Sequence, residues 1–278
     1  DDTVQVARDH GVDHVISLQH NQGLAVAFMA GIDACLARGA DVIVNTDADN
    51  QYDAAGIPLL TAPILEREAD IVIGARPIAQ TAHFSTLKKL LQRLGSWVVR
   101  KASGSSVHDA PSGFRAFSRQ AAMQLNVFSS YTYTLETIIQ AGQKNMAIAS
   151  VPIATNEDLR PSRLLKSISS YVRRSMATII RMFVVYQPFQ FFMTLGCMLF
   201  GAGFLLGLRF LYYYLGGDGD GHIQSLILTG VLLGIGFQTM LVAFIADLLA
   251  VNRRLLEELQ YRSRRQDLSR TSSIEADR

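Results

Sequence analysis

Two long stretches without a charged side chain constrain this chain more than any other feature of its sequence. Phe189–Leu208 and Ile223–Ala246 contain no Asp, Glu, Lys or Arg. A helix of 20 residues is about 30 Å long, roughly the thickness of the hydrocarbon core of a bilayer. Two buried helices of a water-soluble core are the alternative, but such helices are usually shorter and keep a polar edge. We therefore predict two transmembrane helices within residues 188–250.

The distribution of charge predicts the orientation of these helices, although the net charge is only +2. Basic residues gather before the first apolar stretch and after the second, whereas the connecting segment Tyr212–His222 carries Asp218 and Asp220 and no Lys or Arg. Lys and Arg are enriched on the cytoplasmic side of membrane proteins. We expect both flanks, and so both termini, to be cytoplasmic, in a membrane such as the bacterial inner membrane. Arg209, near the outer end, can extend to the interface.

Residues 1–160 alternate short apolar runs with helical patterns. The strands that we expect are residues 13–19, 41–46, 70–74 and 147–154, and the helices are residues 23–38, 54–68, 86–102, 118–125 and 135–142. Strands separated by helices favour βαβ units and a parallel sheet with both faces covered. The predicted fold class of this region is therefore α/β with a mostly parallel sheet.

Residues 161–187 are predicted to form a basic linker and an amphipathic helix. Apolar residues recur at helical spacing from residue 167 to residue 183, and Arg173, Arg174 and Arg181 lie off that stripe. The helix either packs on the preceding domain or lies in the membrane interface with its arginines among lipid phosphates. Its position directly before an apolar stretch favours the interface.

Residues 251–278 follow the second apolar stretch and differ from it in composition. Charged residues at helical spacing predict a cytoplasmic helix to about Arg265. The Ser- and Thr-rich end from Ser269 is typical of a disordered tail.

An acidic motif follows the second predicted strand. Asp47 and Asp49 are separated by one residue, and Gln51 comes two residues later. Carboxylates at the carboxyl end of a parallel strand lie where ligands bind, and two of them can hold Mg²⁺ or Mn²⁺ against a diphosphate. A solvated acidic turn is the alternative. A calcium loop is excluded because its glycine position holds Tyr52 and its final glutamate position holds Pro58.

Basic residues accompany three further motifs. Gly74-Ala75-Arg76 follows the third predicted strand, Asp109 is followed at a short distance by Arg115, and Arg160, Arg163 and Lys166 precede the amphipathic helix. Arginine binds phosphate through two parallel hydrogen bonds. The alternatives are a surface ion pair for the second motif and a polybasic membrane anchor for the third. Together with the acidic motif, these residues indicate a phosphate-rich substrate close to a membrane.

These motifs resemble glycosyltransferase family 2, specifically its polyprenyl-phosphate glycosyltransferase branch, over Asp1 to about Arg265. The resemblance rests on His20-Asn21-Gln22-Gly23, Asp47-Ala48-Asp49-Asn50-Gln51, Gly74-Ala75-Arg76, Asp109 with Ser112-Gly113-Phe114-Arg115, and the basic segment 160–166 before two apolar stretches. It implies a GT-A fold and a UDP- or GDP-sugar donor. Members of the family open with a further strand and helix that carry the base-binding pocket. The resemblance therefore implies that the family's N-terminal strands are missing from this chain.

The resemblance also implies roles for single residues. Asp47 and Asp49 match the metal ligands, Gln51 and Arg76 match donor-phosphate contacts, and Asp49, Asp109 and Arg115 match the catalytic set, in which Asp109 would orient Arg115, the sugar or the metal. The residues expected at the acceptor phosphate are Lys88, Lys89, Arg93, Arg160, Arg163 and Lys166. The branch inverts the anomeric carbon. No general base is needed, since a phosphate monoester with a second pKa of ~6 is already a nucleophilic dianion.

The function expected from the sequence is sugar transfer to a polyprenyl phosphate, such as undecaprenyl phosphate, in cell-envelope synthesis. Nucleic acid is not an expected partner, and Gly201, Gly203 and Gly207 inside an apolar stretch favour helix packing and a possible homo-oligomer. A processive polysaccharide synthase is disfavoured because Trp97, the only tryptophan, lacks the Gln-x-x-Arg-Trp context. A non-catalytic scaffold or flippase partner is disfavoured by the intact acidic and arginine motifs.

Overall fold

The computed structural model describes residues 2–76, 97, 100, 107, 109–127, 133–156, 177, 180–181, 184–217 and 223–276. The chain forms two compact units, each of which is considered by itself. The first consists of residues 1–175 and 257–278, and the second of residues 176–256. The predicted helix at residues 86–102 and the predicted interfacial helix lie largely outside the described residues.

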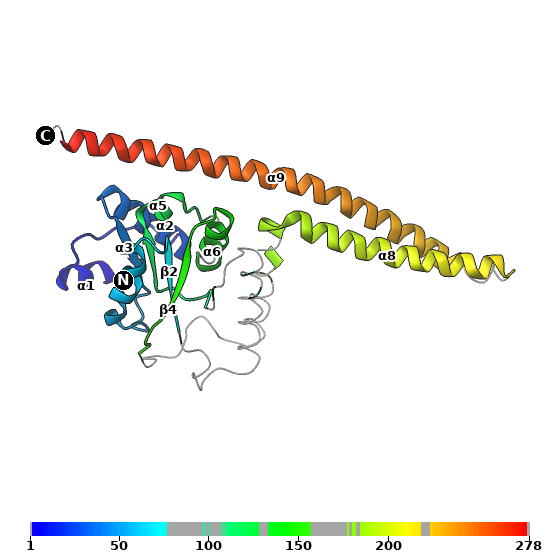
Figure 1. Cartoon of the computed structure of the whole chain (residues 1–278), viewed down its shortest axis with the longest axis horizontal. Coiled ribbons are helices and arrows are strands. Elements are labelled where there is room, and N and C mark those ends of the chain that lie inside the picture. The colour runs from blue at the N-terminus through cyan, green and yellow to red at the C-terminus, as the bar shows by residue number, and fades with distance from the viewer. Residues whose placement is uncertain are drawn as a thin grey trace. The chain divides into compact units, whose positions relative to one another are not determined.

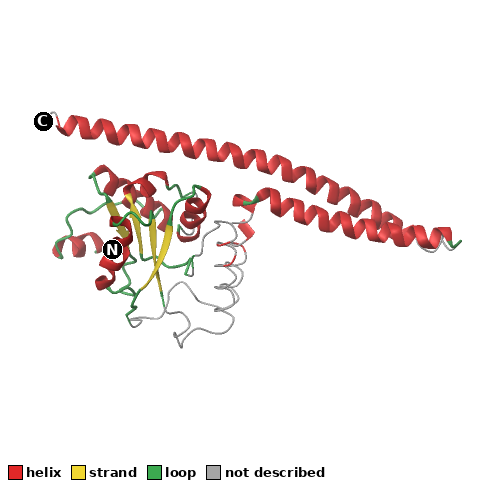
Figure 2. Ribbon diagram, in the orientation of Figure 1, coloured by secondary structure: helices red, strands yellow, loops and turns green. Residues whose placement is uncertain are grey.

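The first unit is an α/β domain whose strands stand between helices (Figures 1 and 2). Its helices are α1 (Thr3–Asp9), α2 (Leu24–Ala37), the short 3₁₀ helix η1 (Ala54–Gly56), α3 (Ile57–Leu65), α5 (Arg119–Gln124) and α6 (Thr134–Gln143). Its strands are β1 (Val42–Asn45), β2 (Ile71–Ala75), β3 (Arg115–Ser118) and β4 (Ile148–Pro152). The α/β class and most of the expected elements are confirmed.

The described strands form one sheet in the order β1-β3-β2-β4. β2 and β4 pair in parallel, whereas β3 lies between β1 and β2 and is antiparallel to both. β1, β2 and β4 therefore share one direction, as expected, and β3 is an inverted strand that the sequence pattern did not predict. This inversion brings the start of β3 to the same sheet edge as the ends of β1 and β2.

The predicted strand at residues 13–19 is wrong. These residues form no strand, and Ile16 is 47% exposed. An apolar run becomes a strand only where a neighbouring strand pairs with its backbone groups. Within the part of the chain that the structure describes, no strand pairs with this segment.

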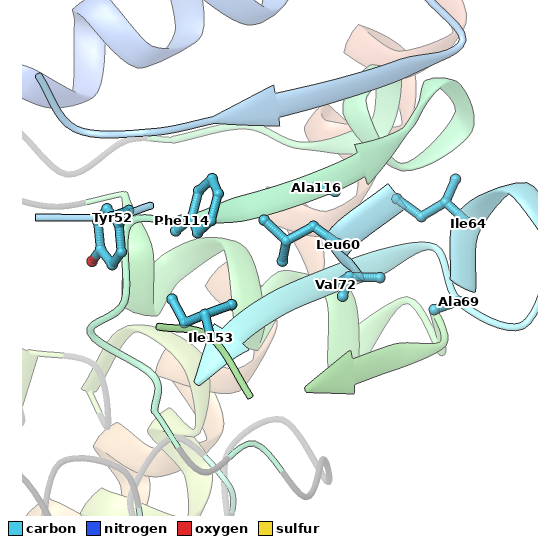
Figure 3. Close-up of a cluster of buried hydrophobic side chains, with 8 residues drawn as sticks. All are labelled: Tyr52, Leu60, Ile64, Ala69, Val72, Phe114, Ala116 and Ile153. Carbon is cyan, nitrogen blue, oxygen red and sulfur yellow. The ribbon is translucent and has the colours of Figure 1, made fainter. Parts of the chain in front are cut away.

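The sheet is covered on both faces. On one face, α3 packs against alternate residues of the strands in a cluster shown in Figure 3, which consists of Tyr52, Leu60, Ile64, Ala69, Val72, Phe114, Ala116 and Ile153. On the other face, Phe28 of α2 contacts the rings of Phe117 and Tyr133, the residue that precedes α6. Side chains alternate between faces along a strand, so Arg115 lies on the α2 side while Phe114 and Ala116 lie on the α3 side.

The second unit contains two helices long and apolar enough to cross a membrane, as predicted. They are α8 (Pro188–Leu215) and α9 (Ile223–Ala276), the latter belonging to this unit up to Leu256. α9 is helical up to Ala276, past Ser269, where a disordered tail was expected.

Glycines set how closely α8 and α9 pack. A Cβ on Gly236 of α9 would lie 2.5 Å from the backbone nitrogen of Phe200, and one on Gly203 would lie 3.0 Å from that of Leu233. Gly201, by contrast, has no atom within 4 Å of such a Cβ. Close backbone approach through small residues is typical of membrane helix pairs. The glycine prediction therefore holds within this pair for Gly203 and for Gly207, where a Cβ would lie 3.0 Å from Cγ2 of Thr229, but not for Gly201.

Candidate active site at the edge of the sheet

Three strand ends bring the candidate residues together. β1 ends at Asn45, just before the acidic motif, and β2 ends at Ala75, just before Arg76. β3 runs in the opposite direction, and its first residue, Arg115, is in register with Asn45 of β1 and Ile73 of β2. The loop that leads into β3, residues 109–113, is called the site loop below. Residues far apart in the sequence thus meet at one edge, where open α/β sheets bind ligands.

Arg76 and Asp109 form a two-pronged ion pair across this edge. Nε and Nη2 of Arg76 donate to the two carboxylate oxygens of Asp109 at 2.8 and 3.0 Å, and the Arg76 backbone N–H donates to the same carboxylate at 3.2 Å. The Asp109 side chain is 1% exposed and that of Arg76 is 17% exposed. Burial alone would lower the pKa of Arg76, but the hydrogen bond and charge of Asp109 outweigh it and raise that pKa. Arg76 is therefore a fixed cation at the sheet edge.

Asp47 sits directly against the site loop. A Cβ on Gly113 would lie 2.4 Å from Oδ2 of Asp47, so only glycine leaves room for this carboxylate. Burial and the charge of Asp49 raise the pKa of Asp47, and the positive charges of Arg115 and Arg76 partly oppose that rise. The ionised carboxylate is therefore less favourable here than in water, and a cation bound beside it would favour the ionised form.

The acidic pair suits a divalent cation that shares its coordination with a ligand. Asp49 is exposed, its Oδ1 accepts from the Gln51 backbone N–H at 3.1 Å, and Asn50 between them has φ of 60°. Among the described residues, no third His, Cys, Asp or Glu completes a cluster. Mg²⁺ and similar ions are commonly held by one or two carboxylates with phosphate oxygens and water. Asp47 and Asp49 fit this kind of coordination.

Asn45, Tyr52 and Tyr133, for which no sequence motif predicts a role in the site, hold the site loop in place. Asn45 Nδ2 lies 2.7 Å from both the Gly113 carbonyl oxygen and the Tyr133 hydroxyl oxygen, to which it donates. The Gly113 backbone N–H donates to the Tyr52 hydroxyl at 3.1 Å. Burial, followed by the charge of Asp47, raises the pKa of Tyr133 to about 12. Tyr133 therefore stays a neutral phenol at physiological pH.

A second asparagine ties down the acidic motif. Beyond β4, the Asn156 backbone N–H donates to the Gln51 carbonyl at 2.9 Å, and Asn156 Nδ2 donates to the Asn50 carbonyl at 3.0 Å. Tyr52 and Thr155 form an isolated β-bridge beside these bonds. No sequence pattern marks Asn156, because its role depends on a contact between distant segments.

Arg115 was expected to belong to the catalytic set, and in the structure its guanidinium is bonded to groups of its own chain. It is fully buried, and its guanidinium donates to the carbonyls of Ser112 and Ala110 at 2.7 and 2.6 Å, to the Thr134 carbonyl at 2.7 Å and to the Thr137 hydroxyl at 2.8 Å. Four of its five N–H groups are thereby used within the chain.

Burial lowers the pKa of Arg115 to about 10, which leaves it charged at neutral pH. Arg115 therefore fastens the site loop to α6. The carboxylate of Asp109, which was expected to orient Arg115, the sugar or the metal, is bonded to Arg76 instead.

The structure brings together Asp47, Asp49, Gln51, Arg76 and Asp109; Nη1 of Arg76 lies 3.4 Å from Gln51 Oε1. The expected acceptor-phosphate residues lie outside the described residues. They are Lys88, Lys89, Arg93, Arg160, Arg163 and Lys166.

Comparison with known proteins points to one family. The model described as "Glycosyl transferase family 2" matches residues 1–125. An uncharacterized glycosyltransferase of Mycobacterium tuberculosis is 30% identical over 156 residues, which cover 55% of this chain and 68% of that protein. The undecaprenyl-phosphate mannosyltransferase of Micrococcus luteus is 30% identical over 155 residues, covering 54% of this chain and 63% of that protein. The chain thus spans a little under two thirds of the latter relative.

A solved structure supports the fold. Glucosyl-3-phosphoglycerate synthase from Mycobacterium tuberculosis superimposes with a TM-score of 0.50 at 22% identity, covering 66% of this chain and 65% of that chain. At this identity the likeness shows the GT-A-like fold alone.

Proposed function

The chain belongs to glycosyl transferase family 2, and from this premise we propose that it transfers a sugar from a nucleotide-diphospho-sugar to a polyprenyl phosphate at the cytoplasmic face of a membrane, inverting the anomeric carbon. The observation that carries the proposal is the acidic pair beside the Arg76–Asp109 ion pair, in a chain that also has two helices apolar enough to cross a membrane. The name of the Micrococcus luteus relative gives the same acceptor class.

Asp47 and Asp49 would hold the donor through a divalent cation, Mg²⁺ or Mn²⁺. When bound, such an ion neutralises the diphosphate and so makes it a better leaving group. The half-buried Asp47 carboxylate packs against Gly113, and the exposed Asp49 can reach toward the ligand. The two carboxylates thus combine one ligand packed against the site loop with one ligand open to solvent.

Arg76 would bind a phosphate of the donor or the acceptor. Asp109 engages Nε and Nη2 and fixes the plane of the guanidinium, so Nη1 is the nitrogen that Asp109 does not engage. A cation oriented in advance loses little freedom on binding an anion and stabilises charge that develops during transfer. In this proposal the protein's task is to hold two anions together.

Asp109 acts as a positioning residue and not as a general base. Both of its carboxylate oxygens are occupied by Arg76, and a polyprenyl phosphate is already dianionic near neutral pH because its second pKa is ~6. An Asp109→Asn variant should lower kcat, since Arg76 loses its ionic partner, while the shape of the pH–rate profile stays the same. Loss of a pH-dependent step between about pH 4 and 7 in this variant would instead identify Asp109 as the base.

The function is tested with the full chain in lipid nanodiscs containing undecaprenyl phosphate. A panel of UDP- and GDP-sugars is supplied with Mg²⁺ or Mn²⁺, the organic phase is examined for a lipid-linked sugar, and NMR gives its anomeric configuration. Asp49→Asn should abolish product, whereas Asp41→Asn, an exposed residue just before β1, should not. Absence of product from every donor would refute the proposal in favour of a scaffold, and a polymeric product would indicate a processive synthase.

A further inference from the structure

The charged part of α9 makes ionic contacts with helices of the first unit, to which its residues from Glu257 onward belong. Glu257 is only 4% exposed, and its Oε2 lies 3.5 Å from Nζ of Lys144, the residue that caps the carboxyl end of α6. Nη2 of Arg264 lies 3.3 Å from Oδ1 of Asp33 in α2. Nη1 of Arg264 donates to the Leu125 carbonyl at 2.7 Å. A helix that served only to keep the chain soluble would leave these charges in water.

These contacts provide hydrogen-bond donors for the carbonyl oxygens at the carboxyl end of α5. Gln124 is the last residue of α5 and Leu125 its cap. Nζ of Lys144 donates to the Gln124 carbonyl at 2.6 Å, next to the carbonyl that Arg264 binds. The last carbonyls of a helix have no partner within it and carry partial negative charge, so cations are favoured there. Lys144 and Arg264 thus fix the end of α5, and Glu257 holds Lys144 in place.

Hydrogen bonds at both ends of α6 connect the end of α5 with the site loop. The Asn126 backbone N–H donates to Gln140 Oε1 of α6 at 3.0 Å, and Gln140 Nε2 donates back to the Asn126 carbonyl. At the other end of α6, Thr134 and Thr137 accept hydrogen bonds from Arg115. Arg115 in turn holds two carbonyls of the site loop, which carries Asp109 and abuts Asp47.

From this continuity we propose that Glu257 and Arg264 are positioning residues of the transferase. They hold the facing ends of α5 and α6, and through α6 and Arg115 they fix the site loop that aligns Arg76 and seats the acidic pair. The charged part of α9 after the second apolar stretch then helps to position the catalytic residues, in addition to following the membrane helix. The kinetic part of this inference rests on the proposed function; the structural part does not.

The chain supplies a matched control on the same segment. Arg262 pairs with Glu258 at 2.9 Å one turn away, and these side chains are 68% and 51% exposed. Arg262→Gln removes the same charge from the same helix without touching α5 or α6. Arg264→Lys keeps a cation beside the Leu125 carbonyl and should retain much of the wild-type behaviour.

Hydrogen exchange of the full chain in nanodiscs, without substrate, is the first measurement. In Arg264→Gln and in Glu257→Gln, backbone amides of residues 110–118 and 133–143 should exchange about tenfold faster, the middle of the range expected for coupling between distant sites. Amides of β2 should be unchanged, and Arg262→Gln should match the wild type. Under saturating donor and acceptor, kcat of the first two variants should fall about tenfold as well.

The outcomes separate the two proposals. Faster exchange confined to residues 257–268 would overturn the inference, because the segment would then be a simple anchor. Faster exchange throughout the first unit that persists in Arg264→Lys would also overturn it, because the effect would be general unfolding. The predicted exchange pattern in a protein whose wild type forms no lipid-linked sugar would support the positioning role while refuting the proposed function.

Discussion

Replacing Gly113 by alanine tests whether the site depends on the close approach of the site loop to Asp47. The added Cβ would lie 2.4 Å from Oδ2 of Asp47 and 3.0 Å from its Cγ, whereas ordinary contact starts at 3.4 Å. The Gly113 backbone is held by Asn45 at its carbonyl and by Tyr52 at its N–H. Since the loop is held on both sides, the carboxylate has to move, by about 1 Å.

The size of the expected effect follows from the geometry of cation binding. Mg²⁺ takes its oxygen ligands at about 2.0–2.1 Å in a near-ideal octahedron, so a shift of about 1 Å removes one ligand from the coordination shell. A misplacement of this size in a catalytic site costs about 10²-fold in rate. That loss corresponds to about 2.7 kcal/mol of activation free energy. We expect kcat/KM of Gly113→Ala to fall about a hundredfold, with weaker Mn²⁺ binding.

Isothermal titration of Mn²⁺ in the presence of a nucleoside diphosphate gives the cation affinity, and initial rates at several Mn²⁺ concentrations give kcat/KM. Gly56→Ala is the matched control. Its Cβ would lie 3.1 Å from Cε1 of Phe114, which crowds the core without touching a carboxylate. The control should lower thermal stability and leave Mn²⁺ affinity unchanged. Wild-type affinity and rate in Gly113→Ala would refute the reasoning.

Three further predictions concern stability. Burial raises the pKa of Asp47 in the folded state above its value in the unfolded state, so the folded state binds the carboxyl proton more tightly. The folded state therefore loses stability as the pH rises through the unfolded and folded pKa values of Asp47. Asp47→Asn should raise the unfolding temperature at pH 7 without divalent cations, by an amount that shrinks as the pH is lowered toward 3.8. Arg115→Met leaves buried carbonyls without donors and should cost at least about 3 kcal/mol in the free energy of unfolding, measured by denaturant titration, and unchanged stability would contradict its anchoring role. Gly236→Ala should lower the thermal stability of the α8–α9 pair in detergent, while Gly234→Ala, whose Cβ would meet nothing within 4 Å, should not, and equal effects would contradict the close-packing argument.

Local sequence patterns were sufficient to predict the helices and strands whose apolar residues recur at regular spacing or form long uncharged stretches. α2, β1, α3, β2, α5, α6 and β4 fall where apolar spacing placed them, and the two apolar stretches form long helices. The acidic motif at the end of β1 was found because two carboxylates after a buried strand form a recognisable pattern. Both signals are carried by neighbouring residues.

The features that were missed depend on contacts between distant residues. β3 has the sequence Arg-Ala-Phe-Ser and begins with a buried arginine, so its composition does not resemble a strand. Arg115 has the side chain of a phosphate ligand, and only the structure shows that carbonyls of its own chain occupy it. Asn45 and Asn156 are ordinary amides whose roles arise because separate segments meet beside the acidic motif.

The place of β3 in the sheet makes the length of the segment from Gly113 to Ser118 as important as its composition. Register pairs Asn45 with Arg115 on one side and Ile73 with Arg115 on the other. Because side chains alternate between faces, inserting or deleting one residue here would turn the guanidinium toward the α3 cluster and Phe114 toward α6. Such a change would dismantle the cation site while every residue of that site remained present. Homologues and engineered variants should therefore keep the residue count of this segment as strictly as they keep Gly113 and Arg115.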